Sequence, residues 1–231
     1  MGTKLFVVGL VFSCSITFVN GQKTTTFTIK PGEKIESIIP DSVSYSYPSF
    51  INGKVYFKDN RQVTAKLNYN SLYEEIMFIT PGGDTMALDN GAVIKYVIIS
   101  ADTFYFDNFF VKNAGSFGDI RLASKELFVI ADATKMGAMG QSAPSAVTTV
   151  KSLLTRSESK ELVRQEIMKI RKETHFYVGD RFNNFKIVNK RNLMDLFPAK
   201  SKKTKEYLKS NTVNFNGRDD LSKMIASLQA E

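Results

Sequence analysis

Side chains that could perform acid–base or metal chemistry are few in this 231-residue chain. His175 is the only histidine, which excludes a zinc site built from several histidines. Its neighbours Phe176 and Tyr177 indicate a strand position. We therefore expect a packed or surface imidazole, with a catalytic or pH-sensing role as the alternative. A Ser-His-Asp triad would have to use this histidine, and no Gly-x-Ser-x-Gly segment supplies the nucleophile.

Carboxylates offer the next source of chemistry, because a glycosidase needs two of them roughly 5–10 Å apart across a sugar. Glu74 and Glu75 are adjacent, so in a strand they point to opposite faces. Asp219 and Asp220 fit the first turn of a helix, where acids interact well with the helix dipole. Three further aspartates could converge in a meander, although each also fits a turn: Asp84, Asp102 and Asp107. We predict no catalytic residue, and keep a carboxylate hydrolase of glycan or peptidoglycan as an alternative.

Motifs for cofactors and metals are missing from the sequence. No Gly-x-Gly-x-x-Gly or Walker-type segment occurs, and Gly137 and Gly140 lack a flanking strand and helix pattern. No Asp-x-Asp-x-Asp calcium loop is present. We therefore predict no cofactor and no metal site.

The first 21 residues have the pattern of a secretory signal. Lys4 is the only charge in the first 22 residues, and an apolar run follows at 5–12. Polar residues interrupt this run well before the roughly 20 residues of a membrane-spanning helix. We predict cleavage after Gly21, with lipidation of Cys14 as the alternative. Export then places the mature chain in the periplasm or on the periplasmic face of the outer membrane, with peripheral association possible and no transmembrane span. Since Cys14 is the only cysteine, the mature chain has neither a disulfide nor a thiolate.

Basic charge is concentrated in the last third of the chain. Residues 22–150 carry 12 Lys+Arg and 13 Asp+Glu, whereas residues 151–231 carry 18 Lys+Arg and 10 Asp+Glu. Five lysines fall in one expected helix: Lys200, Lys202, Lys203, Lys205 and Lys209. They could contact an envelope protein or an acidic envelope polymer, and the alternative is a solvated helix surface. We expect no nucleic-acid partner, because no set of interleaved aromatic residues supports stacking.

The pattern of apolar residues predicts a mainly β protein with a small helical C-terminal module, α+β overall. Residues 22–52 form a polar leader with at most one short strand, at 24–29. Residues 53–130 form an antiparallel meander, folded as a sandwich or open barrel, because short Val/Ile/Tyr/Phe/Thr runs alternate with turn residues. The predicted strands are 54–58, 63–69, 76–80, 85–88, 93–100, 103–106 and 127–130.

The remaining residues divide into three expected segments. Residues 131–154 are rich in Gly, Ala and Ser and predict a linker or long loop. Residues 155–188 extend the β domain, as a short helix that passes into a strand near Glu173. Residues 189–231 form the basic helical module, where Asn189 caps a helix at 190–197, Pro198 begins one that covers 199–210 and Asn216 caps a third. The third helix has one apolar stripe: Leu221, Met224, Ile225 and Leu228.

Several of these segments together resemble a group of uncharacterised exported envelope proteins of Bacteroidetes-type bacteria. The resemblance is carried by residues 53–57, 65–69, 83–85, 189–198, 207–209, 214–215 and 219–221. It covers most of the mature chain and implies an envelope location but no catalytic residue. We expect an exported, non-enzymatic cell-envelope protein that binds or scaffolds; the alternatives are the hydrolase above and a polyanion-binding protein.

Overall fold

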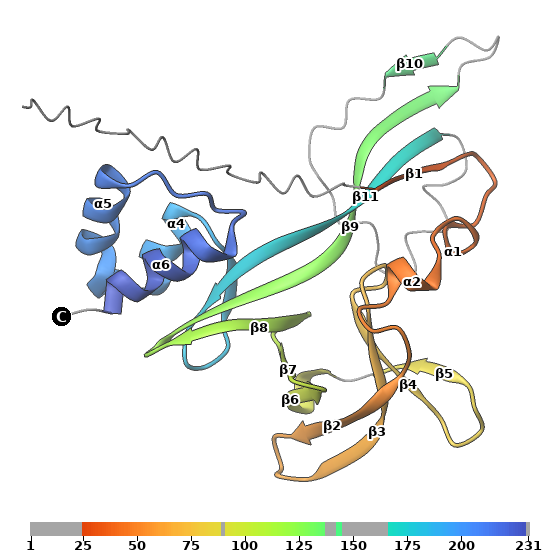
Figure 1. Cartoon of the computed structure of the whole chain (residues 1–231), viewed down its shortest axis with the longest axis horizontal. Coiled ribbons are helices and arrows are strands. Elements are labelled where there is room, and N and C mark those ends of the chain that lie inside the picture. Colours follow the sequence, from red (N-terminus) through yellow and green to blue (C-terminus); the bar gives the residue numbers. More distant parts are fainter. Residues whose placement is uncertain (1–24, 89–90, 137–141, 145–165, 230–231) are drawn as a thin grey trace, which may run out of the picture.

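The computed structural model describes residues 25–88, 91–136, 142–144 and 166–229 (Figure 1). The predicted signal at 1–21, its cleavage site and Cys14 lie outside the described residues. Most of the predicted linker and the start of the predicted helix after residue 155 lie outside them as well.

Within these described residues, the strands form a single open antiparallel sheet of 12 strands, with helices after its last strand. This confirms the predicted fold class, mainly β with a C-terminal helical part. The order is β1-β11-β9-β8-β7-β6-β2-β3-β4-β5, with β10 on β9 and β12 on β11. Bounds are β1 Thr26–Ile29, β2 Ile51–Phe57, β3 Gln62–Asn70, β4 Glu75–Ile79, β5 Thr85–Ala87, β6 Ile94–Ile99, β7 Asp102–Phe106, β8 Phe110–Phe117, β9 Ile120–Met136, β10 Ser142–Pro144, β11 Glu166–Gly179 and β12 Phe185–Ile187, with a 3₁₀ turn at Gly91–Val93.

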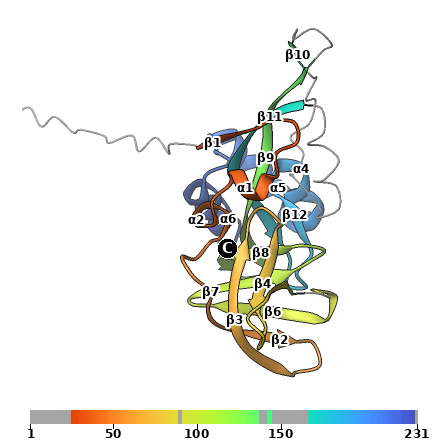
Figure 2. The same cartoon turned by 90° about the vertical axis from the view of Figure 1, so that its right-hand side faces the viewer.

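Apolar alternation explains why the predicted meander forms. Leu67 and Tyr69 stand two apart in β3, and both are buried in a cluster with Val97 of β6 and Phe104 of β7. Val63, the first apolar member of the same alternation, is 52 % exposed at the start of the strand. Figure 2 shows β2, β3 and β4 at the end of the molecule opposite β10.

Two long strands, β9 and β11, connect the meander to the C-terminal part (Figure 1). They pair from Arg121 with Gly179 to Lys135 with Glu166. The predicted loop boundary at 131 is therefore wrong, since β9 continues to Met136. The predicted helix is also wrong over its described part, where β11 already begins at Glu166.

The predicted polar leader contributes to the core. Besides β1 it contains two short helices, α1 Ile35–Ile38 and α2 Asp41–Ser44. Ile29, Ile35 and Ile39 are buried in one cluster with Phe128 of β9 and Ile170 of β11. This segment therefore packs on the long strands.

The C-terminal helices α4 Lys190–Leu196, α5 Ser201–Ser210 and α6 Arg218–Gln229 pack on the other end of β9 and β11 (Figure 1). The Asn192 N–H donates to Asn189 Oδ1 at 2.8 Å, so the predicted cap is present. Pro198 begins a 3₁₀ turn, Pro198–Lys200, that leads into α5. The predicted cap at Asn216 is wrong, because α6 begins at Arg218.

The predicted stripe of α6 is buried, with all four of its apolar residues at most 2 % exposed. Leu221, Met224 and Ile225 share a cluster with Leu122 of β9 and Val178 of β11. Among the helices that the structure describes, none is long and apolar enough to cross a bilayer.

Candidate functional site

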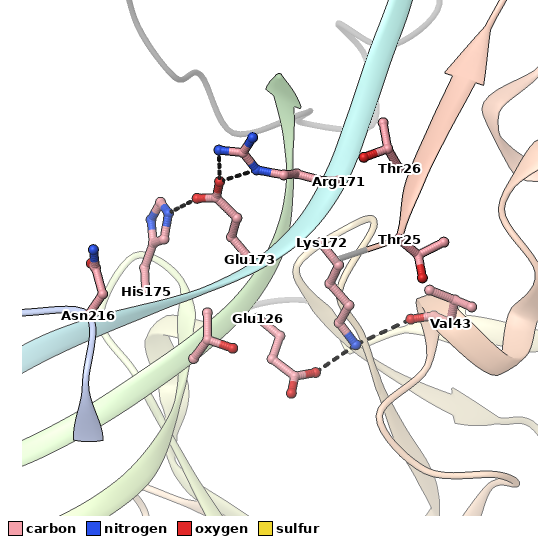
Figure 3. A pocket seen from close by; sticks show the side chains of 10 residues that line it. Thr25, Thr26, Val43, Glu126, Arg171, Lys172, Glu173, His175 and Asn216 are labelled. Carbon is pink, nitrogen blue, oxygen red and sulfur yellow. Dashed lines mark hydrogen bonds and ion pairs between the residues drawn. The ribbon is translucent and has the colours of Figure 1, made fainter. Parts of the chain in front are cut away.

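An open groove of about 760 Å³ runs along the middle of β11 (Figure 3). It extends from the start of β1 to the loop before α6. Its volume falls within the roughly 300–1,000 Å³ of ligand sites. The lining residues are Thr25, Thr26, Val43, Glu126, Arg171, Lys172, Glu173, Thr174, His175 and Asn216.

The pairing of β9 with β11 shows which face of the sheet each charged residue of this groove lies on. Thr174 lies opposite Glu126, so Lys172, two residues away, shares their face of the sheet. Arg171, Glu173 and His175 alternate with these residues and lie on the other face. Figure 3 shows the two sets on either side of the β11 ribbon.

On the first face, Glu126 and Lys172 form an ion pair. Lys172 Nζ lies 2.7 Å from Glu126 Oε2 and donates to the Val43 carbonyl at 3.2 Å. The Ser46 hydroxyl donates to the same carboxylate at 3.3 Å. Burial alone would raise the pKa of Glu126, but the Lys172 hydrogen bond and charge outweigh it and lower the pKa.

On the second face, Glu173 lies between two basic side chains. His175 Nε2 is 2.9 Å from Glu173 Oε2, and the Arg171 guanidinium donates to Glu173 Oε1 at 2.7 Å. Partial burial alone would raise the pKa of Glu173, but the hydrogen bonds from His175 and Arg171 outweigh this effect. The net result is a lowered pKa. The sequence did not reveal this triad, because the predicted helix passed into a strand only near Glu173 and so placed Arg171 on a helix and His175 on a strand. Read as a strand, the spacing Arg-x-Glu-x-His places all three on one face.

Both groove carboxylates are therefore suited to holding charge rather than donating a proton. A general acid at neutral pH needs a raised pKa, whereas Glu126 and Glu173 both have lowered values. Their carboxylates also point to opposite sides of β11 (Figure 3). This arrangement can bind polar or charged groups but does not present two convergent acids to a substrate.

Each of the three aspartates considered for a hydrolase makes a hydrogen bond with a different residue, through the backbone N–H in Asp84 and through the carboxylate in Asp102 and Asp107. Asp84 donates its N–H to the Thr80 hydroxyl in a turn. Asp102 accepts a 2.6 Å hydrogen bond from the Tyr47 hydroxyl. Asp107 accepts one of 2.6 Å from the Phe185 N–H.

The two adjacent acid pairs lie in different surroundings. Glu74 forms an ion pair with buried Lys125, while Glu75 begins β4. Asp219 and Asp220 occupy the first turn of α6, and Asp220 accepts a hydrogen bond from the Asn214 N–H. No group of three or more His, Cys, Asp or Glu suited to a metal gathers in the described part of the chain.

Of the five lysines singled out in the sequence, Lys200 turns inward. Its Nζ donates to the Leu228 carbonyl at 3.2 Å and to Gln229 Oε1 at 3.1 Å, and lies 3.9 Å from Asp119. It thereby binds the last turn of α6, where carbonyls lack helical partners. The other four lie exposed on α5: Lys202, Lys203, Lys205 and Lys209.

Comparisons with protein-family models, with curated proteins and with solved structures gave no match.

Proposed function

We propose that this chain is an exported cell-envelope protein that binds or scaffolds a partner and performs no chemistry of its own. The observation that carries the proposal is the groove beside β11, which is open, polar and lined by charges that neutralise one another. The predicted secretory signal at 1–21 and the resemblance to exported envelope proteins support the location. Lowered pKa values at Glu126 and Glu173 favour binding over acid catalysis.

A photo-crosslinking experiment in the native envelope tests this proposal. The full chain carries benzoylphenylalanine at Thr174, which is exposed inside the groove. We expect a discrete crosslinked envelope partner, and mass spectrometry of the product should also show an N-terminus at Gln22 or an acylated Cys14. The control carries the same group at Lys54, which is exposed on β2. Identical products at both positions, or unprocessed chain in the cytosol, would contradict the proposal.

A polyanion-binding surface on α5 is the second candidate. Lys202, Lys205 and Lys209 follow an i, i+3, i+7 spacing, so they share one exposed face of the helix. We expect their joint replacement by glutamine to lower the salt concentration that elutes the chain from heparin. Each substitution removes a positive charge that would contact a sulfate group, and such contacts are the ones that salt screens. Lys54→Gln with Lys95→Gln and Lys186→Gln removes the same charge elsewhere and is the control. Equal losses in both triple variants would point to net charge rather than to this surface.

A further inference from the structure

The outer edge of β11 is paired at both ends but open in its middle. β1 pairs with Met168 to Arg171, and β12 pairs with Tyr177 to Gly179. Between them, no strand among the described residues pairs with residues 172–175 on that side. The opposite side of β11 is paired with β9 throughout this stretch. The open stretch lies in the groove described above.

The direction of the backbone groups at this edge follows from one hydrogen bond. The Val188 N–H donates to the Phe176 carbonyl at 2.9 Å, which shows that Phe176 directs its backbone groups toward β12. In an antiparallel strand both groups of a residue point the same way, and alternate residues point to the same neighbour. Thr174 and Lys172 therefore present an N–H and a C=O each to the open side. Thr174 is also exposed.

We propose that an extended segment of a partner polypeptide adds to the sheet here, antiparallel to β11 and in one row with β1 and β12. This inference rests on the proposed binding function and names the class of ligand. Two donor–acceptor pairs repeated at two-residue spacing match a polypeptide backbone, which is the basis of strand addition at sheet edges. The four open positions admit roughly 13 Å of extended chain.

The charges around the edge favour an acidic side chain in the added strand. Glu126 and Glu173 are each already bound by a basic neighbour. Among the described residues, Lys172 uses two of its three donors, one on Glu126 and one on the Val43 carbonyl. A residue added opposite Thr174 lies on the same face as Lys172. An aspartate or glutamate at that position would complement the remaining donor.

Binding of a short labelled peptide tests the inference. The probe is fluorescein-labelled Thr-Glu-Thr-Val, which has one residue for each open position and places its glutamate opposite Thr174, and its binding to the mature chain is followed by anisotropy. Thr174→Pro removes the outward N–H and blocks that position with its ring, while the N–H groups that bond to β9 belong to other residues and remain. We expect saturable binding that this variant weakens about fivefold to tenfold. Thr174→Val keeps the backbone donor and should stay within about twofold. A probe N-methylated at two alternate residues should lose its binding.

Amide exchange keeps the inference testable if the proline variant fails to fold. By NMR, the Lys172 and Thr174 amides should exchange quickly in the free mature chain and slow down with the probe. Three results would overturn the inference: equal binding of the N-methylated probe, amides that exchange slowly without peptide, or binding that appears only after removal of residues 22–24. The last result would identify those residues of this chain as the occupant. A partner crosslinked at Thr174 that binds the Thr174→Pro chain equally well would leave the proposed function standing and reject strand addition.

Discussion

Replacing Glu74 by glutamine lowers the free energy of unfolding by about 3 kcal/mol, measured by urea denaturation at neutral pH. Glu74 and Lys125 form an ion pair with side chains only 14 % and 7 % exposed. Lys125 also lies over the Phe109 ring, with Nζ 4.3 Å from the ring centroid. The large effect follows because the variant leaves a buried ammonium without its carboxylate.

Two further variants separate a buried charge from a simple loss of contact. Glu74→Gln combined with Lys125→Met should recover most of the lost stability, since both charges are then gone. Asp59→Asn breaks the exposed pair with Arg61, whose side chain is 73 % exposed, and should leave the midpoint unchanged. A double variant as unstable as Glu74→Gln would show that the charge of Lys125 is not the cause.

Replacing Leu221 by alanine lowers the free energy of unfolding by about 3 kcal/mol. In urea, the helices and the sheet of this variant still unfold in one transition. Leu221 is fully buried where α6 packs on Ile120 and Leu122 of β9. The alanine leaves a cavity at the contact between the C-terminal helices and the long strands. Far-ultraviolet circular dichroism reports the helices, and near-ultraviolet tyrosine signals report the sheet.

The decisive observation is whether the far-ultraviolet and near-ultraviolet signals of Leu221→Ala change at the same urea concentration. Lys223→Ala changes an exposed residue of the same helix and should stay within about 0.5 kcal/mol of the unmodified chain. If the helical signal of Leu221→Ala disappears at lower urea while the tyrosine signal persists, the C-terminal helices unfold independently, and the shared cluster does not couple them to β9 and β11.

The sequence predicted those strands that are short apolar runs between clear turns. β2 to β7 fall close to their predicted positions because runs of Val, Ile, Tyr, Phe and Thr are bounded there by turn residues, and β3 also alternates apolar with polar residues. β8 was missed, since its middle, Asn113 to Ser116, consists of small and polar residues. Its pairing with β7 and β9 stabilises it instead, and the sequence does not display such non-local partners.

Charged residues are the reason that the full length of β9 and β11 was not predicted from the sequence. In the first part of β11 the buried apolar residues Met168 and Ile170 stand two apart, as in a strand, whereas Ile167 and Ile170 have the spacing of a helix. Lys169 lies opposite Asp132, and their side chains approach to 3.4 Å. Because such cross-strand pairing joins residues far apart in sequence, the groove and its Arg171–Glu173–His175 set emerged only from the structure. The lysines of α5 could be predicted, but the inward turn of Lys200 could not.

The pairing of β1 with β11 has a consequence for how the chain folds during its synthesis. Thr26 finds its partner, Arg171, about 145 positions later in the chain. β1 is synthesised early but cannot pair until β11 has been synthesised. Closing the long loop between the two strands also slows folding. During that interval its apolar side chains, Phe27 and Ile29, stay unprotected. A chain that emerges N-terminus first would benefit from a chaperone that holds this segment until β11 arrives.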